Sequence, residues 1–531
     1  MIIALFVVSA IFSIVLVTLE FRRDLMMFQQ NSYRPDRYRH WLAESGDSTS
    51  MMRLGGFIVF FAAIVGFGHI IAGDILIAIF SLFASINLAR RKYKKPLVMT
   101  LRATRILVTS LVMAAIVCAL AVIFFAPIAW TPSLFALAEA SIGCYCLSHL
   151  FILAANAVLD PWEKSINRRY YNDAKNRLES MPQLKIIGIT GSYGKTTTKH
   201  YLHRILSEHY DTLMTPGSYN TTLGVVRTVR EMLKPYHQVF IVEMGAKQKG
   251  DIKEICELVN PQAGIITAVG PQHLESFKSL DNVQSTKFEL ADAIPQEGFV
   301  LVNNDFPKIA EREVDNTRCI RYALNNEKES QYIATNIIYG ATGSTFMVED
   351  IRDNWTIELA TPLVGECNIS NLTAAVAMAH SLGVPDAKIA YAVSRMEQVE
   401  HRMFIKRIPG SLTIIDDAFN SNPVGSSMAL DVLAAMPGKR ILITPGMIEL
   451  GDQEFELNEK FGFKAASCAD IVIIVGKYNR ESITKGLKDG KMPAEGIIHA
   501  DTFNDAQAIL KSVSQAGDTV LYENDLPDTF K

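Results

Sequence analysis

The sequence predicts a polytopic α-helical membrane domain followed by two α/β domains. Three observations predict this fold class. Long apolar runs are confined to residues 1–160. An apolar strand breaks into a glycine-rich loop and a Lys-Thr helix start at residues 186–199, as in a P-loop ATPase domain with a parallel sheet. From residue 184 onward, β-branched runs alternate with helical stretches, which is typical of a parallel sheet covered on both faces.

With 531 residues, the chain is long enough for three or four domains. We expect a transmembrane domain at residues 1–160 and a cytoplasmic linker at 161–183. A central ATP-binding domain should follow at 184–402, and a Rossmann-like α/β domain at 403–531.

The transmembrane domain should contain about five helices, one for each apolar run. The runs are Ile2–Leu19, Gly55–Ala72, Ile75–Leu88, Ile106–Pro127 and Ser133–Leu159. Ile75–Leu88 is short for a crossing, so three full spans with a re-entrant pair around Gly73 are an alternative.

The loops between these runs differ in charge, which predicts their orientation. Basic residues crowd the first loop, the loop before the fourth run and the segment after the last run. They include Arg22, Arg23, Arg34, Arg37, Arg39, Arg53, Arg90, Arg91, Lys164, Arg168 and Arg169. By the positive-inside rule, the N-terminus lies outside and everything after residue 160 is cytoplasmic. We therefore expect a multi-pass protein of the inner (cytoplasmic) membrane, in contact with membrane lipids.

Residues 181–531 are acidic, with 34 Lys and Arg against 44 Asp and Glu. An acidic surface argues against a nucleic-acid partner. Seven scattered cysteines show no zinc-like spacing, which favours a reduced cytosolic enzyme part.

The glycine-rich loop after the first strand has the composition of a phosphate-binding site. Gly191 and Gly194 would let the backbone turn tightly, and the helix beginning near Lys195 adds its positive end. Lys195 would reach the β- and γ-phosphates of ATP, and the Thr196 hydroxyl a Mg²⁺ ion. The first glycine stands three residues before Gly194, which is shorter than the common five-residue spacing. The predicted nucleotide-binding residues here are Gly191, Ser192, Tyr193, Gly194, Lys195, Thr196 and Thr197.

Two further strands end in residues suited to metal binding. Glu243 follows the apolar run Val239–Val242, and its carboxylate could hold the Mg²⁺ of a bound nucleotide; a solvated strand-end Glu is the alternative. His273 follows the strand Ala263–Thr267, where a metal or phosphate role and a structural role both remain open. Because active-site residues of such sheets come from the carboxyl ends of strands, both positions are candidates.

Four segments occur in the order seen in Mur ligases, and the sequence resembles that family over residues 184–531. They are Thr190–Thr197, the Glu243 strand end, His273-Leu274-Glu275-Ser276-Phe277, and Asp416-Asp417-Ala418-Phe419-Asn420-Ser421-Asn422-Pro423. The last is most similar to the branch that adds D-alanyl-D-alanine to a UDP-N-acetylmuramoyl tripeptide. Where the family carries a soluble domain for the uridine nucleotide, this sequence has its apolar helices.

The resemblance implies roles for individual residues. ATP and two Mg²⁺ ions would be bound with Thr196, Glu243, His273 and Lys287 at the metals. Lys287 resembles a lysine that is carbamylated in many members, and a surface lysine of a helix is the alternative. Asn368 and Asn371, expected before a helix at Leu372–Leu382, would lie on the adenine side, and Cys367 stands where the family usually has His. Arg402, Asp417 and Asn420 would face the nucleotide, and Asn220, Thr221 and Asn422 the substrate. The implied catalytic residues are Lys195, His273, Lys287, Arg402 and Asp417.

The implied reaction is ATP-dependent amide formation through an acyl phosphate, because a free carboxylate resists attack by an amine. The substrates would be a cell-envelope precursor, UDP-linked or lipid-linked, and D-Ala-D-Ala or a related amino acid. A membrane-bound poly-γ-glutamate synthase-like ligase and a non-catalytic nucleotide-binding membrane scaffold remain alternatives. The sequence does not indicate the oligomeric state.

Overall fold

A computed structural model describes residues 2–65, 70–91, 93, 95–125, 130–272, 274–340, 343–407, 410–418 and 421–525. The described chain forms two compact units, which divide between Arg168 and Arg169. Each unit has its own hydrophobic cores.

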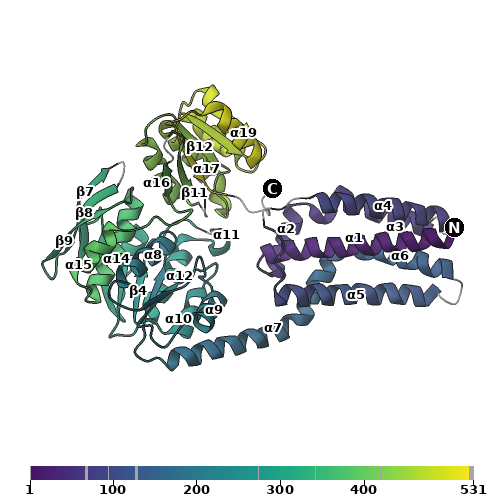
Figure 1. The fold of residues 1–531 in the computed structure, drawn as a ribbon, viewed down its shortest axis with the longest axis horizontal. Helices are drawn as coiled ribbons and strands as arrows, with labels where there is room; N and C mark the ends of the chain where they lie inside the picture. Colours follow the sequence, from purple (N-terminus) through teal and green to yellow (C-terminus); the bar gives the residue numbers. More distant parts are fainter. Residues whose placement is uncertain are drawn as a thin grey trace. The chain divides into compact units, whose positions relative to one another are not determined.

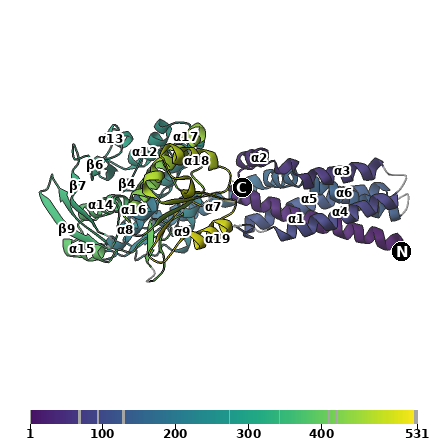
Figure 2. The ribbon, with the colours of Figure 1, turned by 90° about the horizontal axis from the view of Figure 1, so that it is seen from above.

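The N-terminal unit is helical, and its apolar helices lie side by side in a bundle (Figures 1 and 2). The helices are α1 (Ile2–Gln30), α2 (Pro35–Glu44), α3 (Met51–Val65), α4 (Ile70–Arg90), α5 (Leu101–Phe125), α6 (Trp130–Cys146) and α7 (Ser148–Glu179). Among the described residues, α1, α4 and α5 are long and apolar enough to cross a membrane. Helices α6 and α7, bent by 76° where they meet, would add a fourth span if they are counted as one.

Three boundaries differ from the prediction. The expected break at Gly73 is wrong, because this residue lies inside α4. A Cβ at Gly73 would lie 3.2 Å from the Phe135 ring, so the glycine allows α4 to approach α6 closely and does not end the helix. The first helix continues beyond Leu19 to Gln30, and α7 continues through most of the segment expected to be a linker.

A buried network of charges joins α1, α3 and the bend between α6 and α7. The Arg53 side chain is 1% exposed and donates hydrogen bonds to Asp24 and Glu20, each over 2.8 Å. Its other terminal nitrogen donates to Ser148 Oγ over 3.0 Å and to the Cys146 carbonyl oxygen over 3.3 Å. Arg53 therefore donates to a free carbonyl oxygen at the carboxyl end of α6 and offsets the charge of two buried acids. The sequence indicated only that Arg53 belongs to a basic loop that orients the helices in the membrane.

The second unit begins with a sheet of nine strands. Its strands are β1 (Lys185–Thr190), β2 (Thr212–Met214), β3 (Val239–Glu243), β4 (Ala263–Ile266), β5 (Phe299–Asn303), β6 (Arg318–Ala323), β7 (Tyr332–Gly340), β8 (Gly343–Asp350) and β9 (Trp355–Thr361). The order is β2-β3-β1-β4-β5-β6-β7-β8-β9. The pairs from β2 to β7 are parallel, and β7, β8 and β9 pair antiparallel.

Helices cover both faces of this sheet (Figure 1). They are α8 (Lys195–Leu206), α9 (Thr222–Glu231), α10 (Asp251–Val259), α11 (Leu274–Phe277), α12 (Leu280–Ala293), α13 (Pro307–Ala310), α14 (Glu366–Ser381) and α15 (Asp386–Ser394). Helices α8, α14 and α15 pack in one hydrophobic core, and α9, α10 and α12 pack in the other. Every residue of β3 is buried, as expected for a strand covered on both faces.

The C-terminal sheet has six strands in the order β10-β11-β15-β12-β13-β14. Its elements are β10 (Phe404–Arg407), β11 (Thr413–Asp417), α16 (Pro423–Ala434), β12 (Arg440–Thr444), α17 (Glu454–Cys468), β13 (Ile471–Val475), α18 (Arg480–Asp489), β14 (Ile497–Ala500), α19 (Phe503–Val513) and β15 (Thr519–Glu523). All pairs are parallel except β10 with β11. Helices α16, α17 and α18 cover one face and α19 the other, so two consecutive α/β domains are present as predicted.

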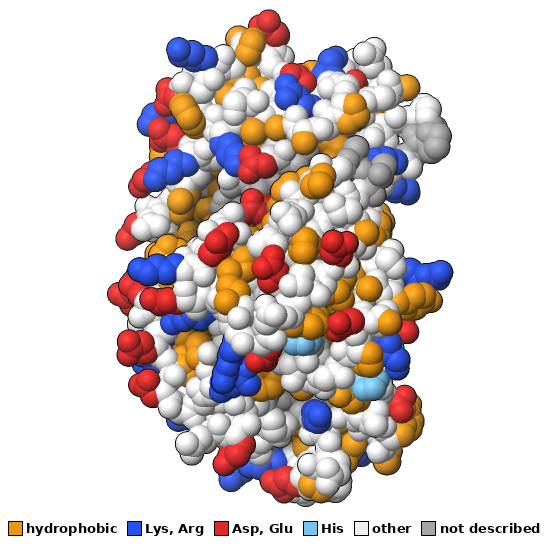
Figure 3. Space-filling view, turned by 90° about the vertical axis from the view of Figure 1, so that its left-hand side faces the viewer, with side chains coloured by type: hydrophobic (Ala, Val, Ile, Leu, Met, Phe, Trp, Pro, Cys, Tyr) orange, Lys and Arg blue, Asp and Glu red, His pale blue; other side chains and the backbone are white. Residues whose placement is uncertain are grey.

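On the face of the molecule drawn in Figure 3, acidic and basic side chains are interspersed and no extended basic patch is seen. Charges of both signs are therefore mixed on this face.

Candidate nucleotide and ligation site

The loop between β1 and α8 has a backbone that only glycine adopts easily. Gly191 and Gly194 have φ angles of 149° and 77°. A Cβ at Gly191 would lie 2.9 Å from the Ala268 nitrogen, and one at Gly194 would collide with Asn371 Oδ1. Both glycines are therefore needed for the loop to lie between the end of β4 and α14.

The side chains of the loop fix it to the segment after β4. Ser192 Oγ donates to the Gly270 carbonyl oxygen over 3.1 Å, and Tyr193 OH donates to that of Pro271 over 3.3 Å. Thr197 is buried in the first turn of α8. Ser192 and Tyr193 thus shape the loop through these contacts.

Lys195 folds back over this loop. Its Nζ donates hydrogen bonds to the carbonyl oxygens of Gly191, over 2.5 Å, and Ser192, over 3.2 Å. Burial lowers the pKa of Lys195 to about 8, although Glu243 opposes this shift. The ammonium group is thus held at the centre of the glycine-rich turn, where a phosphate would replace the loop carbonyls as its partner.

Glu243, at the end of β3, is the point where several polar side chains meet. Its Oε1 accepts hydrogen bonds from Thr196 Oγ1 over 3.1 Å and from Asn220 Nδ2 over 3.2 Å. Its Oε2 lies 3.0 Å from Lys199 Nζ. Burial alone would raise the pKa of Glu243, but Lys199 and Lys195 hold it below its ordinary value. The carboxylate is therefore charged and positioned next to the phosphate loop, which fits a Mg²⁺ ligand.

The sequence did not predict Lys199 as a site residue, although its spacing from Lys195 could have indicated it. It stands four residues after Lys195, so both lie on the same face of α8. Its side chain is fully buried, and Nζ also donates to the Gly217 carbonyl oxygen over 2.5 Å.

Lys287 lies in α12, as a helical lysine should, but it is 2% exposed and is not a surface residue. Burial lowers its pKa to about 7, with a smaller contribution from the charge of Lys195. Its Nζ lies 5.8 Å from the centroid of the Phe277 ring. A buried amine with this pKa is uncharged in about half of the molecules at neutral pH, and the uncharged amine is the form that reacts with CO₂.

Asn368 and Asn371 lie within α14, so their predicted position before the helix is wrong. The helix begins at Glu366, directly after Gly365, whose φ of 95° turns the chain into it. Asn368 Oδ1 accepts from Tyr201 OH and its Nδ2 donates to the Val364 carbonyl oxygen, both over 2.8 Å. The first bond fastens α14 to α8, and the second holds the chain at the start of α14.

The first strands of the C-terminal domain bring Asp417 and Arg402 towards the same region. Asp417 Oδ1 accepts a hydrogen bond from the Met403 N–H over 3.0 Å, while burial raises the pKa of this carboxyl to about 6. Burial lowers the pKa of Arg402, and the charges of Asp417 and Glu243 oppose that shift. Arg402 thus lies within electrostatic reach of both the C-terminal Asp417 and the central Glu243.

Two of the predicted substrate residues cap helices. Thr221 Oγ1 accepts from the Gly224 N–H over 3.3 Å at the start of α9, and Asn422 Oδ1 accepts from the Gly425 N–H over 2.8 Å at the start of α16. Asn220, the third residue predicted to face the substrate, donates a hydrogen bond to Glu243. His273 and Asn420 lie outside the described residues, so their predicted roles stay predictions.

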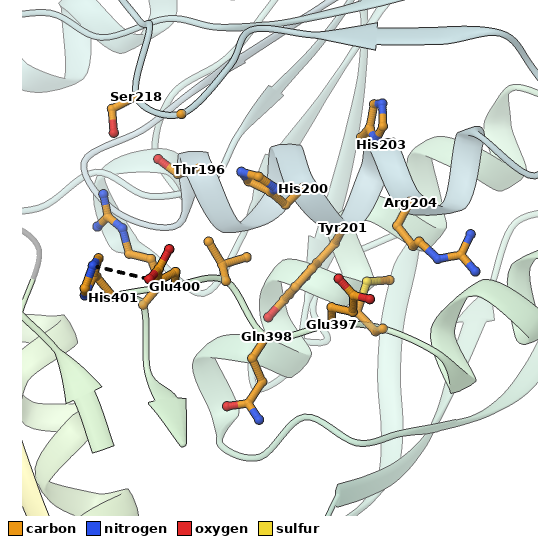
Figure 4. A pocket seen from close by; sticks show the side chains of 14 residues that line it. Thr196, His200, Tyr201, His203, Arg204, Ser218, Glu397, Gln398, Glu400 and His401 are labelled. Carbon is orange, nitrogen blue, oxygen red and sulfur yellow. Dashed lines mark ion pairs between the residues drawn. The ribbon is translucent and has the colours of Figure 1, made fainter. Parts of the chain in front are cut away.

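A pocket of about 500 Å³ runs along α8 from Thr196 (Figure 4). One wall consists of α8 side chains, including His200, His203 and Arg204. The other wall is the segment from Met396 to Arg402, which leads into the C-terminal domain, and Gly217 and Ser218 lie at its edge. Burial lowers the pKa of His200 to about 4, with Lys199 adding to the shift, so this imidazole is neutral at physiological pH.

Comparison with known proteins accounts for both domains of the second unit. The family model for the Mur ligase middle domain matches residues 189–379, and the one described as Mur ligase, glutamate ligase domain matches residues 401–522. The UDP-N-acetylmuramoyl-tripeptide--D-alanyl-D-alanine ligase of Buchnera aphidicola subsp. Acyrthosiphon pisum is 30% identical over 310 residues, which are 58% of this chain and 67% of that relative. This chain belongs to the Mur ligase family. The predicted resemblance is therefore confirmed for the middle and C-terminal domains.

Other members of the family match the same part. The Escherichia coli ligase of the same name is 31% identical over 56% of this chain, and the match spans 65% of its own length, slightly less than two thirds. The crystal structure of MurF from Acinetobacter baumannii superimposes with a TM-score of 0.61 at 27% identity, covering 67% of this chain and 77% of MurF. MurF from Thermotoga maritima in complex with ADP shares the fold, with a TM-score of 0.60 at 22% identity and coverage of 67% and 80%.

Proposed function

We propose that this Mur ligase is an ATP-dependent, ADP-forming ligase that joins a carboxylate to an amine through an acyl phosphate. The observation that carries the proposal is the arrangement around Glu243. This buried carboxylate receives Thr196 from the phosphate loop and Asn220 from the neighbouring loop, and it lies within electrostatic reach of Arg402. The side chains that would bind phosphate and metal therefore lie close to an arginine that leads into the C-terminal domain, as phosphoryl transfer requires.

The residues fit the two cofactors. The loop backbone, which has no room for a Cβ at Gly191 or Gly194, would hold the ATP phosphates together with Lys195. The pocket along α8, which Thr196 and Arg402 line, would take the ribose and base. By the family resemblance, Asp417 and Asn420 would also face the nucleotide. Thr196 and Glu243 would hold Mg²⁺, and His273 and a carbamylated Lys287 would complete a two-metal site. When bound, ATP supplies the phosphoryl group that activates the carboxylate.

The chain's own groups have separate tasks in this proposal. Lys195 and Arg402 place positive charge where phosphate oxygens would lie. Lys199 keeps Glu243 charged and fixed, and Asn220 joins the substrate loop to it. The walls of the pocket and the C-terminal domain would exclude water, which would otherwise hydrolyse an acyl phosphate.

For the substrates, we propose addition of D-Ala-D-Ala, or a related amino acid, to a cell-wall precursor, because the relatives named above are UDP-N-acetylmuramoyl-tripeptide--D-alanyl-D-alanine ligases. The apolar helices suggest that the enzyme is anchored in the inner membrane among lipids, with its catalytic domains in the cytoplasm. The precursor would then be UDP-linked or lipid-linked.

The test is ligation by the full-length protein in detergent with Mg²⁺, ATP, D-Ala-D-Ala and matched UDP-linked and lipid-linked tripeptides. We expect ADP release that depends on both the carboxylate and the amine, and its loss in Lys195→Ala. ATP consumption that is unchanged in Lys195→Ala, or that needs neither substrate, would contradict a ligase. Faster turnover of one precursor would identify the linkage that the enzyme prefers, and equal turnover would show that the linkage does not matter.

The membrane proposal has its own test. We expect the protein to remain in the membrane fraction after an alkaline carbonate wash, and a C-terminal tag to be cleaved by protease in inverted vesicles but not in intact spheroplasts. Release by carbonate would contradict the anchor, and cleavage in spheroplasts would contradict the orientation.

A further inference from the structure

Glu523 is a buried acid that neither the sequence analysis nor the roles above include. It is the last residue of β15 and is 1% exposed. Its Oε1 accepts a hydrogen bond from Ser421 Oγ over 2.5 Å. Its Oε2 is buried and has no hydrogen-bond partner among the described residues. Burial raises the pKa of this carboxyl well above its usual range, and the neighbouring Asp417 adds to the shift.

The position of Glu523 is that of a ligand-binding residue. Strands β11 and β15 are parallel neighbours, and Asp417 is the register partner of Glu523. Adjacent strands lie about 4.8 Å apart, so the two carboxyl groups are on the same side of the sheet at its carboxyl edge. Ligands of open α/β sheets bind at this edge.

Three loops converge on the same place. Asn524, directly after Glu523, donates from Nδ2 to the Gly446 carbonyl oxygen over 2.6 Å, in the loop after β12. Its Oδ1 accepts from the Ser421 N–H over 3.4 Å, in the loop after β11. The environment of Glu523 is therefore built by the ends of β11, β12 and β15 together.

A carboxyl oxygen that is buried without a partner is costly, and a cation arriving from outside would remove that cost. Asp417 and Glu523 carry two potential negative charges, and Arg402 is the nearby cation that acts on Asp417. Ionisation of both carboxyl groups would leave an excess negative charge. Glu523, which its raised pKa keeps protonated in the empty site, would therefore lose its proton when a small cationic group that can donate hydrogen bonds, such as an ammonium, binds beside it.

We infer that Glu523 binds the ammonium group of the amine substrate at the carboxyl edge of the C-terminal sheet. This inference rests on the proposed ligase function, which requires an amine that enters as an ammonium ion. One proton would pass from the ammonium to Glu523 Oε2. The lone pair of the neutral amine then forms the C–N bond as the C–O bond to phosphate breaks, and a second amine proton leaves with the phosphate.

The experiment compares two nucleophiles with wild type, Glu523→Gln and Glu523→Asp. D-Ala-D-Ala brings an ammonium group, whereas hydroxylamine is largely uncharged at neutral pH and traps an acyl phosphate as a hydroxamate. The matched control is Glu481→Gln, an exposed acid on α18 of the same domain. Thermal unfolding and the KM for ATP are measured for each protein, so that a folding defect is recognised.

We expect Glu523→Gln to raise the KM for D-Ala-D-Ala by about 10- to 100-fold, because one charge-assisted hydrogen bond is lost. Hydroxamate formation and the KM for ATP should stay near their wild-type values. Glu523→Asp should retain more dipeptide ligation than Glu523→Gln, and Ser421→Ala should show a smaller increase in the same KM.

Three results would overturn the inference. Equal KM values for D-Ala-D-Ala in wild type and Glu523→Gln would show that Glu523 does not bind the amine. An equal loss of dipeptide and hydroxamate products would assign it to activation of the carboxylate. A higher Mg²⁺ requirement with an unchanged dipeptide KM would make it a metal ligand. If wild type formed neither product, the proposed function itself would fail, which is a distinct outcome.

Discussion

Thr198 Oγ1 donates a hydrogen bond to Asn371 Oδ1 over 3.1 Å, joining α8 to α14 directly behind the phosphate loop. The same Asn371 oxygen occupies the space in which a side chain at position 194 would have to lie. The shape of the phosphate loop thus depends on a side chain that is distant in sequence.

We expect Gly194→Ala to abolish nucleotide binding while the protein still folds. The new methyl group would collide with Asn371 Oδ1, and a φ of 77° is strained for alanine. Isothermal titration with ADP and Mg²⁺ measures the loss. The control is Gly476→Ala, which has a φ of 79° but nothing within 4 Å of its Cβ. Equal ADP affinity in the two variants would contradict this explanation.

Lys199→Met should destabilise the catalytic unit by about 3–5 kcal/mol, because Glu243 would remain buried without its nearest counter-charge. Chemical denaturation monitored by intrinsic fluorescence measures the free energy of unfolding. Lys488→Met, which removes an exposed lysine from α18, serves as the control and should change it by less than about 0.5 kcal/mol. Similar values for both variants would show that the buried pair contributes little.

Lys287 should react with CO₂ more readily as pH rises. Its folded pKa of about 7 lies below the ordinary value of 10.5, so the fraction of uncharged amine grows as pH rises through about 7. We expect ¹³C-bicarbonate to give a carbamate signal in NMR spectra that is stronger at about pH 8 than at about pH 6, and absent in Lys287→Arg. A signal independent of Lys287 would exclude this site.

In the absence of bicarbonate, the lowered pKa of Lys287 also makes the free energy of unfolding depend on pH. Between pH values of about 7 and 10.5 the unfolded state binds more protons at Lys287 than the folded state does, so stability should rise with pH in this window. Lys287→Met should remove this part of the pH dependence, and an unchanged slope would contradict the burial of the amine.

Arg53→Met should lower the thermal stability of the protein in detergent, since Asp24 and Glu20 would lose the nearer of their two arginine partners and be left with Arg23. The expected cost is about 3–5 kcal/mol. Arg22→Met, which removes an exposed neighbouring charge, is the control. If both variants melted at the same temperature, the network around Arg53 would have no structural importance.

The sequence predicted most of the α/β fold, because buried strands and glycine-rich turns are local patterns. The run Val239–Val242 lies in β3, and the strand expected at Ala263–Thr267 differs from β4 by one residue. The sequence did not predict the residues whose environment is created by tertiary packing. Lys199 and Glu523 resemble ordinary polar residues until α8 packs on β3 and β15 joins β11.

The predicted helix boundaries were wrong near glycines, because a glycine can either end a helix or allow another helix to pack closely against it. Gly73 was interpreted as a break, but it lies inside α4 because Phe135 of another helix needs the space beside it. Gly365 does mark a boundary, and the helix after it starts six residues earlier than its apolar pattern indicates.

The ammonium of Lys199 contacts two partners, the Glu243 carboxylate and the Gly217 carbonyl oxygen. Any substrate that rearranges the Gly217 segment must therefore also alter how firmly Glu243 is held. By thermodynamic reciprocity, a ligand at that segment and a cation at Glu243 would change each other's affinity by the same factor. Binding at the Gly217 segment and binding at Glu243 would thus be coupled through the Lys199 side chain, with positive or negative cooperativity.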